Sequence, residues 1–583
     1  MRYPKKKEDL KNSKLPVDTK HFSSEFKEKL LEKLTEKADL DDLLDGLLIK
    51  SENWQALNLI LNKYKEKVQT IYIDPPFNKE QDADYLYNVK YKDSTWISML
   101  ENRLKLAKDL LSEKGSIFVR CDYNGNWLVR PLMNEIFGEE NFRNEIILQR
   151  LKYAKGAKEI FLNKTESLFL YSKSEKFIPN EVKRMKIKYL IAKEILKEVS
   201  SLLKLDNNKT EELLNEIFWF NSVHLPGERE SPARRVFGIN LLPPKGRRWA
   251  FSQESLDKAA AANRLRLVCK KCGYKHYQGI WKKCPICGNE KDVLLQIYDI
   301  WDSLTTNWTD IESYSITYNF PTENSEILLK RVIESTSNEG ELVMDFFLGS
   351  GTTTAVAHKL KRKWIGVEMG EHFWTVVLPR MKKVLFYDKS GISKENDVKE
   401  KYNEKTAGGF FKYHTLEQYE DALENIEFQQ GSEEQQNLLM QLPDYFVKYM
   451  LEWETKSSST FLNLEKLKDP FNYQLNIIEN YQQKKINVDV IETFNYLIGL
   501  FVNRYEFVND NGRRYIFVFG ERNGKKCLVV WRNIENLDYN RDKEIIENNL
   551  NSFKPDEIYI NGDAVISDFK PIEPLFKSLI FEG

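Results

Sequence analysis

A short run of residues with unusual chemistry follows a β-rich segment near the start of the chain. Val68–Ile73 predicts a buried strand, and Asp74, Pro75, Pro76 and Phe77 come directly after it. The prolines fix φ and remove two backbone donors, which leaves a rigid rim with free carbonyls. Asp74 and the Pro75 carbonyl can accept the two N–H bonds of a planar exocyclic amine, while Phe77 stacks on its ring. We interpret this run as a candidate catalytic pocket; a turn that merely closes a strand is the alternative.

A second run is typical of a turn that binds a nucleoside. Leu342–Phe346 predicts a strand, and a Gly-Ser-Gly turn at 349–351 leads from it into a helix. Glycines let the backbone approach a ligand closely, and a helix N-terminus offers N–H groups to negative charge. Glu368 ends the next predicted strand, where an acid would hold a ribose diol. No lysine follows the turn, so it is not a Walker loop; an ordinary strand-to-helix turn is the alternative.

Four of the six cysteines form two CxxC pairs, Cys269 with Cys272 and Cys284 with Cys287. A glycine follows the second cysteine of each pair, which allows the tight turn of a zinc ribbon at 269–287. Four thiolates close a tetrahedral shell, so the spacing predicts a structural zinc site. Four unrelated reduced thiols are the alternative.

Strands that alternate with helices surround both runs and predict an α/β fold with a parallel sheet. The expected helices are 96–111, 325–336 and 352–360, and the further strands are 117–121, 146–149, 167–171 and 364–367. Near the C-terminus, residues 515–529 alternate like a hairpin that turns at Asn523-Gly524. The predicted divisions are an N-terminal helical extension (1–40), a first α/β segment (41–176), an insertion (177–300), a second α/β segment (301–395) and an α+β C-terminal domain (396–583).

Composition limits the class of protein. The chain has 583 residues, with 88 Lys and Arg against 88 Asp and Glu, so its formal net charge is zero. This balance excludes a uniformly basic binder, but a nucleic-acid footprint needs a local patch only. Hydrophobic residues make up 41% of the chain, which suits globular packing. With no apolar run long enough for a membrane helix and no secretory signal, we expect a cytoplasmic protein without a membrane partner.

Taken together, the runs DPPF (74–77) and DFFLGSGT (345–352) resemble those of the β-group of DNA amino-methyltransferases, in the same order. Within this group, the motifs of the chain most resemble those of the modification subunits of type III restriction systems. It covers roughly residues 41–176 and 296–390. Further matching segments are SENWQAL (51–57), GSIFVRCD (115–122), LMNEIFGEENFRNEI (132–146), NFPTENSEILLKRVI (319–333) and RKWIGVEM (362–369).

The resemblance implies a Rossmann-like sheet that uses S-adenosylmethionine, with a target-recognition domain inserted at 177–300. Asp74 to Phe77 would form the base pocket, and Asp rather than Ser before Pro-Pro favours N6 of adenine over N4 of cytosine. Duplex DNA would have to flip out its target base, at a cost of a few kcal/mol. A non-catalytic DNA-binding specificity module and a cytosine-N4 or RNA methyltransferase are the alternatives. The cofactor residues that the resemblance implies are Asn53, Asp345, Phe346, Phe347, Gly349, Ser350, Gly351, Thr352 and Glu368.

Two positions depart from the family pattern. Asn324-Ser325 stands where the family usually carries Lys-Pro, and Phe346 stands where Pro is common. We expect these changes to affect cofactor affinity and not the type of reaction.

Basic residues gather inside the insertion. Residues 264–291 hold eight Lys or Arg and one acid, and a second cluster at 234–248 precedes Trp249. Phosphate contacts position a protein on DNA, and Arg at base edges specifies sequence; solvated side chains around a small ribbon are the alternative for any one of them. The expected DNA-binding residues are Arg234, Arg235, Lys245, Arg247, Arg248, Arg264, Arg266 and Lys282.

The remaining expectations concern partners. By family analogy we expect double-stranded DNA, a homodimer and a separate ATP-dependent restriction subunit with helicase and nuclease activity. Residues 400–583 would serve dimerisation or docking. Residues 413–447 carry eight acids and no Lys or Arg, and we assign them to protein partners because they would repel phosphate.

Overall fold

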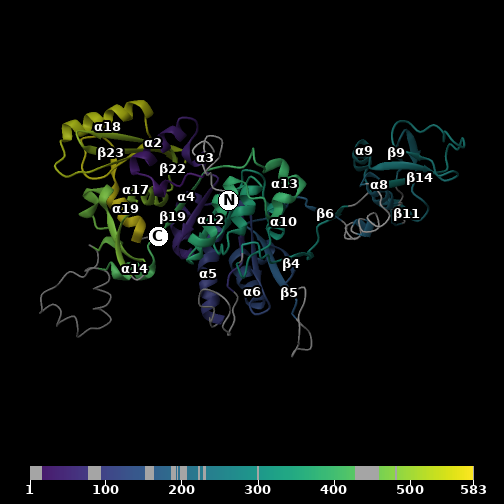
Figure 1. Cartoon of the computed structure of the whole chain (residues 1–583), viewed down its shortest axis with the longest axis horizontal. Coiled ribbons are helices and arrows are strands. Elements are labelled where there is room, and N and C mark those ends of the chain that lie inside the picture. Colours follow the sequence, from purple (N-terminus) through teal and green to yellow (C-terminus); the bar gives the residue numbers. More distant parts are fainter. Residues whose placement is uncertain are drawn as a thin grey trace, which may run out of the picture. The chain divides into compact units, whose positions relative to one another are not determined.

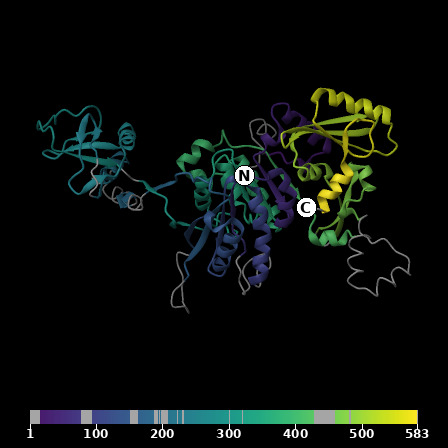
Figure 2. The ribbon, with the colours of Figure 1, turned by 180° about the vertical axis from the view of Figure 1, so that it is seen from behind.

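The computed structural model divides the chain into two compact units, residues 1–180 with 306–583, and residues 181–305. Figures 1 and 2 show the ribbon from opposite sides. The residues that the structure describes are 16–76, 93–150, 163–185, 192–193, 195–196, 207–220, 223–227, 232–298, 301–318, 320–426, 458–479 and 482–581. Within these residues, no helix combines the length and the apolar content that crossing a bilayer requires.

A nine-stranded sheet forms the centre of the larger unit, in the order β16-β4-β5-β3-β2-β17-β18-β1-β19. Its strands are β1 (Gly46–Lys50), β2 (Val68–Ile73), β3 (Leu111–Cys121), β4 (Phe142–Gln149), β5 (Thr165–Ser172), β16 (Asn307–Glu312), β17 (Leu342–Asp345), β18 (Lys363–Glu368) and β19 (Phe411–Thr415). Runs of buried apolar residues in β1, β2 and β18 fit strands that are covered on both faces.

The sheet is mixed, not wholly parallel as predicted. β5 runs antiparallel to both of its neighbours, β3 and β4. The ladder between β4 and β5 continues beyond the strands, because Arg150 N donates to Lys164 O at 2.8 Å. Antiparallel neighbours can be joined directly, whereas a parallel pair needs a crossover. The sequence carries no helical pattern between these two strands, and the prediction overlooked that signal.

Two layers of helices cover the sheet (Figure 1). One layer holds α4 (Asn53–Tyr64), α5 (Asp93–Leu110) and α6 (Asn126–Phe137), which pack in that order. Their apolar faces form one core with the strands, and the fully buried Trp96, Leu100 and Leu104 of α5 belong to it. The other layer holds α10 (Glu326–Thr336), α11 (Thr352–Lys359) and α12 (Leu378–Phe386), again packed in chain order.

The order of the strands decides where the two chemical runs, DPPF (74–77) and DFFLGSGT (345–352), begin. β2 and β17 are parallel neighbours, with Ile71 opposite Met344. Asp74 therefore leaves β2 at the same edge at which Asp345 ends β17. Ligands of α/β sheets bind outside the carboxyl ends of the strands, so this edge is where a site is expected.

The C-terminal residues build a second, five-stranded sheet. Its strands are β22 (Phe501–Asp510), β23 (Arg513–Arg522), β24 (Lys525–Arg532), β25 (Glu557–Ile560) and β26 (Phe569–Pro571), in that order. The predicted turn at Asn523-Gly524 is confirmed, because it joins β23 to β24 with φ of 50° and 74°. Positive φ at both turn residues is typical of a type I′ hairpin, which favours Asn-Gly.

The ends of the chain are not separate from the central sheet. β19 pairs with β1 in parallel, with Gly46 opposite Phe411. The sheet therefore extends past residue 395, where the sequence analysis placed a domain boundary. Helix α2 (Ser24–Thr35) of the N-terminal extension packs on β22, and α17 (Val490–Leu497) packs on α4. Residues 427–447 of the acidic stretch lie outside the described residues.

The smaller unit, residues 181–305, has its own core. A four-stranded sheet has the order β13-β12-β14-β7; these strands are β13 (Lys275–His276), β12 (Leu265–Cys269), β14 (Val293–Tyr298) and β7 (Trp219–Phe220). Two small two-stranded sheets add to it: the hairpin of β9 with β10 (Arg234–Val236 and Ile239–Leu241), and the antiparallel pair of β8 with β11 (His224–Pro226 and Arg247–Trp249), which precede and follow that hairpin in the chain. Leu265, Leu267, Trp249 and Trp281 pack together in its core. The sequence analysis placed this insertion at 177–300.

Candidate active site

Residues 74–76, which we call the ledge, are held in place by β2 and by Trp96. The last three residues of β2 are buried and lead straight into Asp74. Trp96 of α5, itself fully buried, donates from Nε1 to the carbonyl of Pro76 at 2.9 Å. The indole therefore fixes the end of the ledge. Phe77 lies outside the described residues, so its stacking role stays a prediction.

Asp74 has a polar environment that the sequence analysis did not anticipate. Asn324 donates from Nδ2 to Oδ2 of Asp74 at 3.0 Å, and an Nη1 of Arg120 lies 3.5 Å from the same oxygen. Burial raises the pKa of Asp74 to about 6; Arg120 and the bond from Asn324 lower it, and the charge of Glu166 raises it. The carboxylate is ionised at neutral pH, but it takes up a proton more readily than an exposed Asp.

Behind Asp74 lies a buried ion pair. Arg120, on β3, donates from Nε to Glu166 of β5 at 2.8 Å, and both side chains are fully buried. Tyr314 donates to Glu166 Oε1 at 3.1 Å, and its ring lies 4.3 Å from the Arg120 guanidinium. An arginine inside the apolar strand pattern IFVRC was the sequence signal for this pair, since buried charges require partners.

Asp345 organises the glycine turn. Its Oδ1 accepts from Phe347 N at 2.9 Å, and its Oδ2 accepts from the Thr353 hydroxyl at 2.5 Å. Burial raises the pKa of Asp345 to about 7, and the charge of Asp74 contributes to this rise. That electrostatic coupling fits carboxylates on neighbouring strand ends. The turn itself needs glycine, because Gly349 and Gly351 have φ of 56° and 82°.

Glu368 caps the turn from the next strand. Its Oε2 accepts from Gly349 N at 2.8 Å, and its Oε1 accepts from Gly370 N at 2.8 Å. His372 lies 3.3 Å from Oε1 and is 4% exposed. Among the described residues, neither ring nitrogen of His372 has a hydrogen-bond partner. His372 is therefore a buried imidazole whose one charged neighbour among the described residues is Glu368, and no sequence motif pointed to it.

Asn53 supports the turn from α4. Its Nδ2 donates to the Phe346 carbonyl at 3.1 Å, and its Oδ1 accepts from Arg103 Nε at 2.8 Å. Both ends of the amide are therefore hydrogen-bonded, and the amide holds the backbone of the 345–352 run in place at Phe346. Phe346 itself is 1% exposed, so its ring packs in the core and its backbone is the part that borders the turn.

Ser350 and Thr352 turn their side chains inward. Arg380 of α12, fully buried, donates to the Thr352 hydroxyl at 2.9 Å and to the Ser350 carbonyl at 3.2 Å. Arg380 is held in turn by Glu326 at 3.0 Å. These side chains hold the loop in shape, and the backbone N–H groups at the start of α11 remain the part suited to a ligand. Arg380 was not singled out from the sequence.

The four cysteines of the smaller unit meet at one point. Their sulfur atoms lie within 4.8 Å of one another, with Cys269 and Cys287 at 3.5 Å and Cys272 and Cys284 at 3.4 Å. All four are free thiols. Four sulfurs bound to one zinc at about 2.3 Å would lie about 3.8 Å apart. The cluster thus has the dimensions of a tetrahedral thiolate site.

Most of the basic residues predicted to contact DNA lie on the surface of the smaller unit. Those with exposed side chains are Arg235, Lys245, Arg247, Arg248 and Lys282. Arg234 and Arg264 are half-buried, and Arg264 donates from Nε to the Tyr298 carbonyl at 3.2 Å. Their DNA contacts stay a prediction.

Arg266 is a correction to the predicted set. It is 4% exposed and donates to Gln296 at 2.8 Å and to Glu216 at 3.0 Å. Its guanidinium also lies 4.2 Å from the ring of Trp219. The side chain lies on β12, where burial against β14 and α8 (Asn207–Ile217) leaves it a structural role. The count of charges along the sequence could not separate it from its exposed neighbours.

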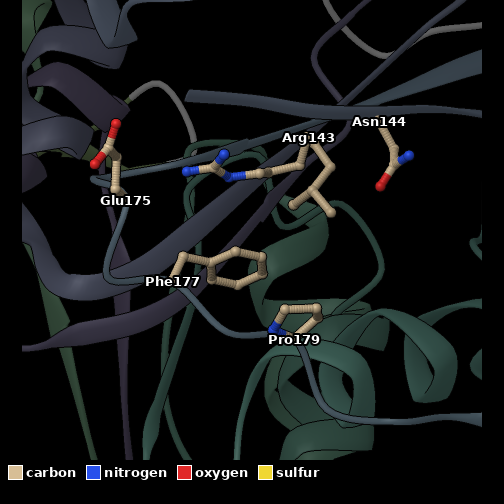
Figure 3. Close-up of a pocket in the computed structure, with 6 residues that line it drawn as sticks. Arg143, Asn144, Glu175, Phe177 and Pro179 are labelled. Carbon is tan, nitrogen blue, oxygen red and sulfur yellow. The ribbon is translucent and has the colours of Figure 1, made fainter. Parts of the chain in front are cut away.

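A cavity of about 420 Å³ in the larger unit is lined by other residues (Figure 3). Arg143 extends toward Glu175, with Phe177 and Pro179 below them in the view. Arg143 is already engaged, because it donates to the Ser172 hydroxyl at 2.9 Å and to the Ser174 carbonyl at 3.2 Å. No residue of the two chemical runs lines this cavity.

Comparison with known proteins identifies relatives of this chain. The sequence profile of the DNA methylase family matches residues 68–378. The chain is 29% identical over 459 residues to the "probable type III restriction-modification enzyme HindVI Mod subunit" of Haemophilus influenzae, which covers 70% of this chain. It is 27% identical to the type II methyltransferase M.EcaI of Enterobacter cloacae over 56% of this chain. It is 22% identical to the EcoP15I Mod subunit of Escherichia coli over 54%.

These matches span 58%, 67% and 56% of the three relatives' own lengths. The profile match includes both chemical runs and covers more than half of the 583 residues. The chain therefore belongs to the DNA methylase family.

Proposed function

We propose that this protein transfers a methyl group from S-adenosylmethionine to N6 of adenine in duplex DNA, as the modification and specificity subunit of a restriction-modification system. The observation that carries the proposal is the placement of the Asp74 ledge and the Asp345 turn on adjacent parallel strands, β2 and β17. A base gripped by the ledge would face a cofactor held by the turn.

The residues at the turn fit the cofactor. At Gly349 an added Cβ would meet only Phe320, at 3.8 Å, so the turn is open there, just before α11. Glu368 offers carboxylate oxygens where a ribose diol would lie, and the imidazole of His372 lies beside it. When bound, S-adenosylmethionine supplies an electrophilic methyl group on a positively charged sulfur.

The ledge does the remaining work. Asp74 and the Pro75 carbonyl accept the two hydrogens of the amine, which orients the nitrogen lone pair away from the ring plane. This positioning is the main contribution of the protein, because an amine of this kind needs no full prior deprotonation. Asp74 then accepts the proton that the methylated nitrogen loses, and its pKa of about 6 suits a group that must release that proton to water.

Adenine is the preferred substrate because the ledge begins with Asp, which the family uses before Pro-Pro for N6 chemistry. The test uses the purified chain, radiolabelled cofactor and mixed-sequence duplex DNA, followed by nucleoside digestion and mass analysis. N6-methyl-2′-deoxyadenosine as the product supports the proposal. N4-methyl-2′-deoxycytidine would identify cytosine as the substrate, and the absence of any methylated nucleoside would leave a DNA-binding specificity module as the function.

The smaller unit would recognise the DNA target. Its exposed basic side chains are Arg235 on β9, Arg247 and Arg248 on β11, and Lys282 in the cysteine region. Such a surface can contact phosphates and base edges. Binding would flip the target base out of the duplex, since the ledge is closed from behind by Trp96 and Arg120.

We also propose that Cys269, Cys272, Cys284 and Cys287 hold a structural zinc ion. Their sulfur spacing fits the tetrahedral site described above, and Asn289 donates to Cys269 Sγ at 3.2 Å. Amide donors to coordinating sulfurs are the usual surroundings of such sites. Four protein ligands leave no open position, so the ion would stabilise the unit and take no part in the reaction.

The partners follow from the relatives. Two of them are named Mod subunits of type III restriction-modification enzymes. We propose that this chain likewise acts as a homodimer with an ATP-dependent restriction subunit, through its C-terminal residues. Co-purification of the full chain with an ATP-dependent restriction subunit, and the mass of the full chain in solution, test both parts.

A further inference from the structure

Asn324 links the catalytic ledge to a buried charge. It lies just before α10, while Asp74 follows β2 and Arg120 lies on β3. Asn324 Nδ2 donates to Asp74 Oδ2 at 3.0 Å. Its Oδ1 accepts from Tyr72 OH at 3.0 Å and from Arg120 Nη1.

The donors fix the orientation of this amide. Arg120 has N–H groups and no acceptor, so the atom of Asn324 that faces it must be the oxygen. The NH₂ group then faces Asp74, and the carboxylate receives a donor whichever way Tyr72 turns its hydroxyl. Arg120 cannot move away, because Glu166 binds it inside the sheet with both side chains fully buried.

The two oxygens of Asp74 are consequently unequal. Every hydrogen bond or ion pair that the described residues make with this carboxylate goes to Oδ2. Oδ1 is the oxygen left to an incoming amine. Asn324 thus determines both the rotamer of Asp74 and which of its oxygens faces the substrate.

We propose that Asn324 is a positioning residue for Asp74, holding Oδ2 so that Oδ1 accepts the hydrogen of the target amine. This inference rests on the proposed methyl transfer. It also gives the departure from the family's Lys-Pro a different consequence from the one expected from the sequence, because Asn324 bonds the catalytic carboxylate.

The charges that face Asp74 determine how it titrates. Burial has the largest effect and raises its pKa, Arg120 lowers it, and Glu166 and Asp122 raise it. Tyr72 and Asp345 lie on the two strands that bear the site, and Tyr72 is held protonated by burial and by the charge of Asp74. The hydrogen bond from Asn324 lowers the pKa of Asp74, so its removal moves the acid limb of the rate to higher pH.

The test compares Asn324→Ala and Asn324→Asp with the parent chain and with Asn58→Ala. Asn58 is a partly exposed control on α4 that donates from Nδ2 to the Trp54 carbonyl. We measure kcat for methyl transfer from pH 5 to pH 9, the cofactor Kd and the unfolding temperature. We expect Asn324→Ala to lower kcat about 100-fold, as for a misplaced catalytic group. Asn324→Asp should move the acid limb further upward, because it sets a second carboxylate beside Asp74.

In both variants the cofactor Kd should stay within about twofold of the parent, because Asn324 contacts the ledge and not the glycine turn. Parent-like kcat and pH profiles would overturn the inference. So would a loss of activity in which the acid limb stays in place and the unfolding temperature falls, since this outcome identifies a structural role. A parent chain without methyl transfer would instead refute the proposed function, and the inference with it.

Discussion

The carboxyl edge of the central sheet and the surface of the inserted unit use arginine in opposite ways. At the edge, Arg120 and Arg380 are fully buried and each is bound to carboxylates. On the inserted unit, Arg247 and Arg248 are exposed on the short strand β11. Buried arginines hold the carboxylates and backbone around them in place, because leaving a buried charge unpaired is costly. Exposed arginines remain available to phosphate and bases. The difference separates the residues that shape the reaction from those that would find its target.

The sharpest test of the catalytic edge is Asp74→Ala. We expect a loss in kcat of about 1,000-fold, because the carboxylate both orients the amine and receives its proton. Cofactor binding should be kept, since the turn at 349–351 is built by other residues. Filter-binding assays with labelled cofactor and DNA measure both quantities. Glu101→Ala, on the exposed side of α5, is the control, and methyl transfer by Asp74→Ala at the parent rate would remove Asp74 from the mechanism.

Loss of the zinc site should affect the inserted unit without affecting cofactor binding. Cys284→Ser removes one thiolate, and we expect the zinc content to fall from about one ion per chain toward zero, with DNA binding lost. The cofactor Kd should be unchanged, because the cofactor residues belong to the other compact unit. Metal analysis and DNA titration measure the effect. Cys527 is a buried thiol of the C-terminal core, so the Cys527→Ala variant should have the same zinc content as the parent chain. Equal zinc loss in both variants would contradict the proposed zinc site.

The pH profile distinguishes the edge from an ordinary surface carboxylate. Because the pKa of Asp74 is raised from 3.8 to about 6, protonation begins at a higher pH than for a free Asp. The rate should be full near pH 8 and fall about tenfold for each pH unit below 6. Measuring kcat at saturating cofactor keeps the titration of Asp345, with its pKa of about 7, out of the profile. An acid limb near pH 4 would show that Asp74 is not the titrating group.

The smallest effect should come from single arginines of the inserted unit. Arg248→Ala is expected to weaken DNA binding about tenfold or less and to lower the salt dependence, without a change in stability. Arg266→Ala is expected to leave DNA binding unchanged and to lower the unfolding temperature of this unit by roughly 5 °C. DNA titrations at two salt concentrations and calorimetry separate the two. A stable Arg266→Ala variant with weakened DNA binding would restore Arg266 to the predicted contact surface.

Local patterns predicted the parts of the fold that depend on neighbours in sequence. The apolar run before Asp74, the turn at 349–351 and the hairpin at Asn523-Gly524 are all visible in a few adjacent residues. The same is true of the CxxC pairs, whose sulfurs the structure brings together.

The parts that were missed depend on partners far apart in the chain. Asn324 and Arg120 are separated by 204 residues, and Asn53 and Phe346 by 293. Their pairing follows from which strands become neighbours, and periodicity does not specify that order. The burial of Arg266 and the place of β19 beside β1 have the same origin.

Helix α4 has a consequence for anyone who shortens this protein. At one end Asn53 bonds the Phe346 carbonyl, and at the other Asn62 bonds the Leu497 carbonyl at 2.7 Å. Gly499, with a φ of 73°, fits against the backbone of Asn62 so tightly that a Cβ would lie 2.7 Å from its oxygen. The twelve residues of α4 thus connect the turn at 349–351 to the C-terminal residues around Leu497. Deleting these C-terminal residues would free one end of α4, so we expect the truncated protein to lose cofactor affinity as well as any partner that it binds through them.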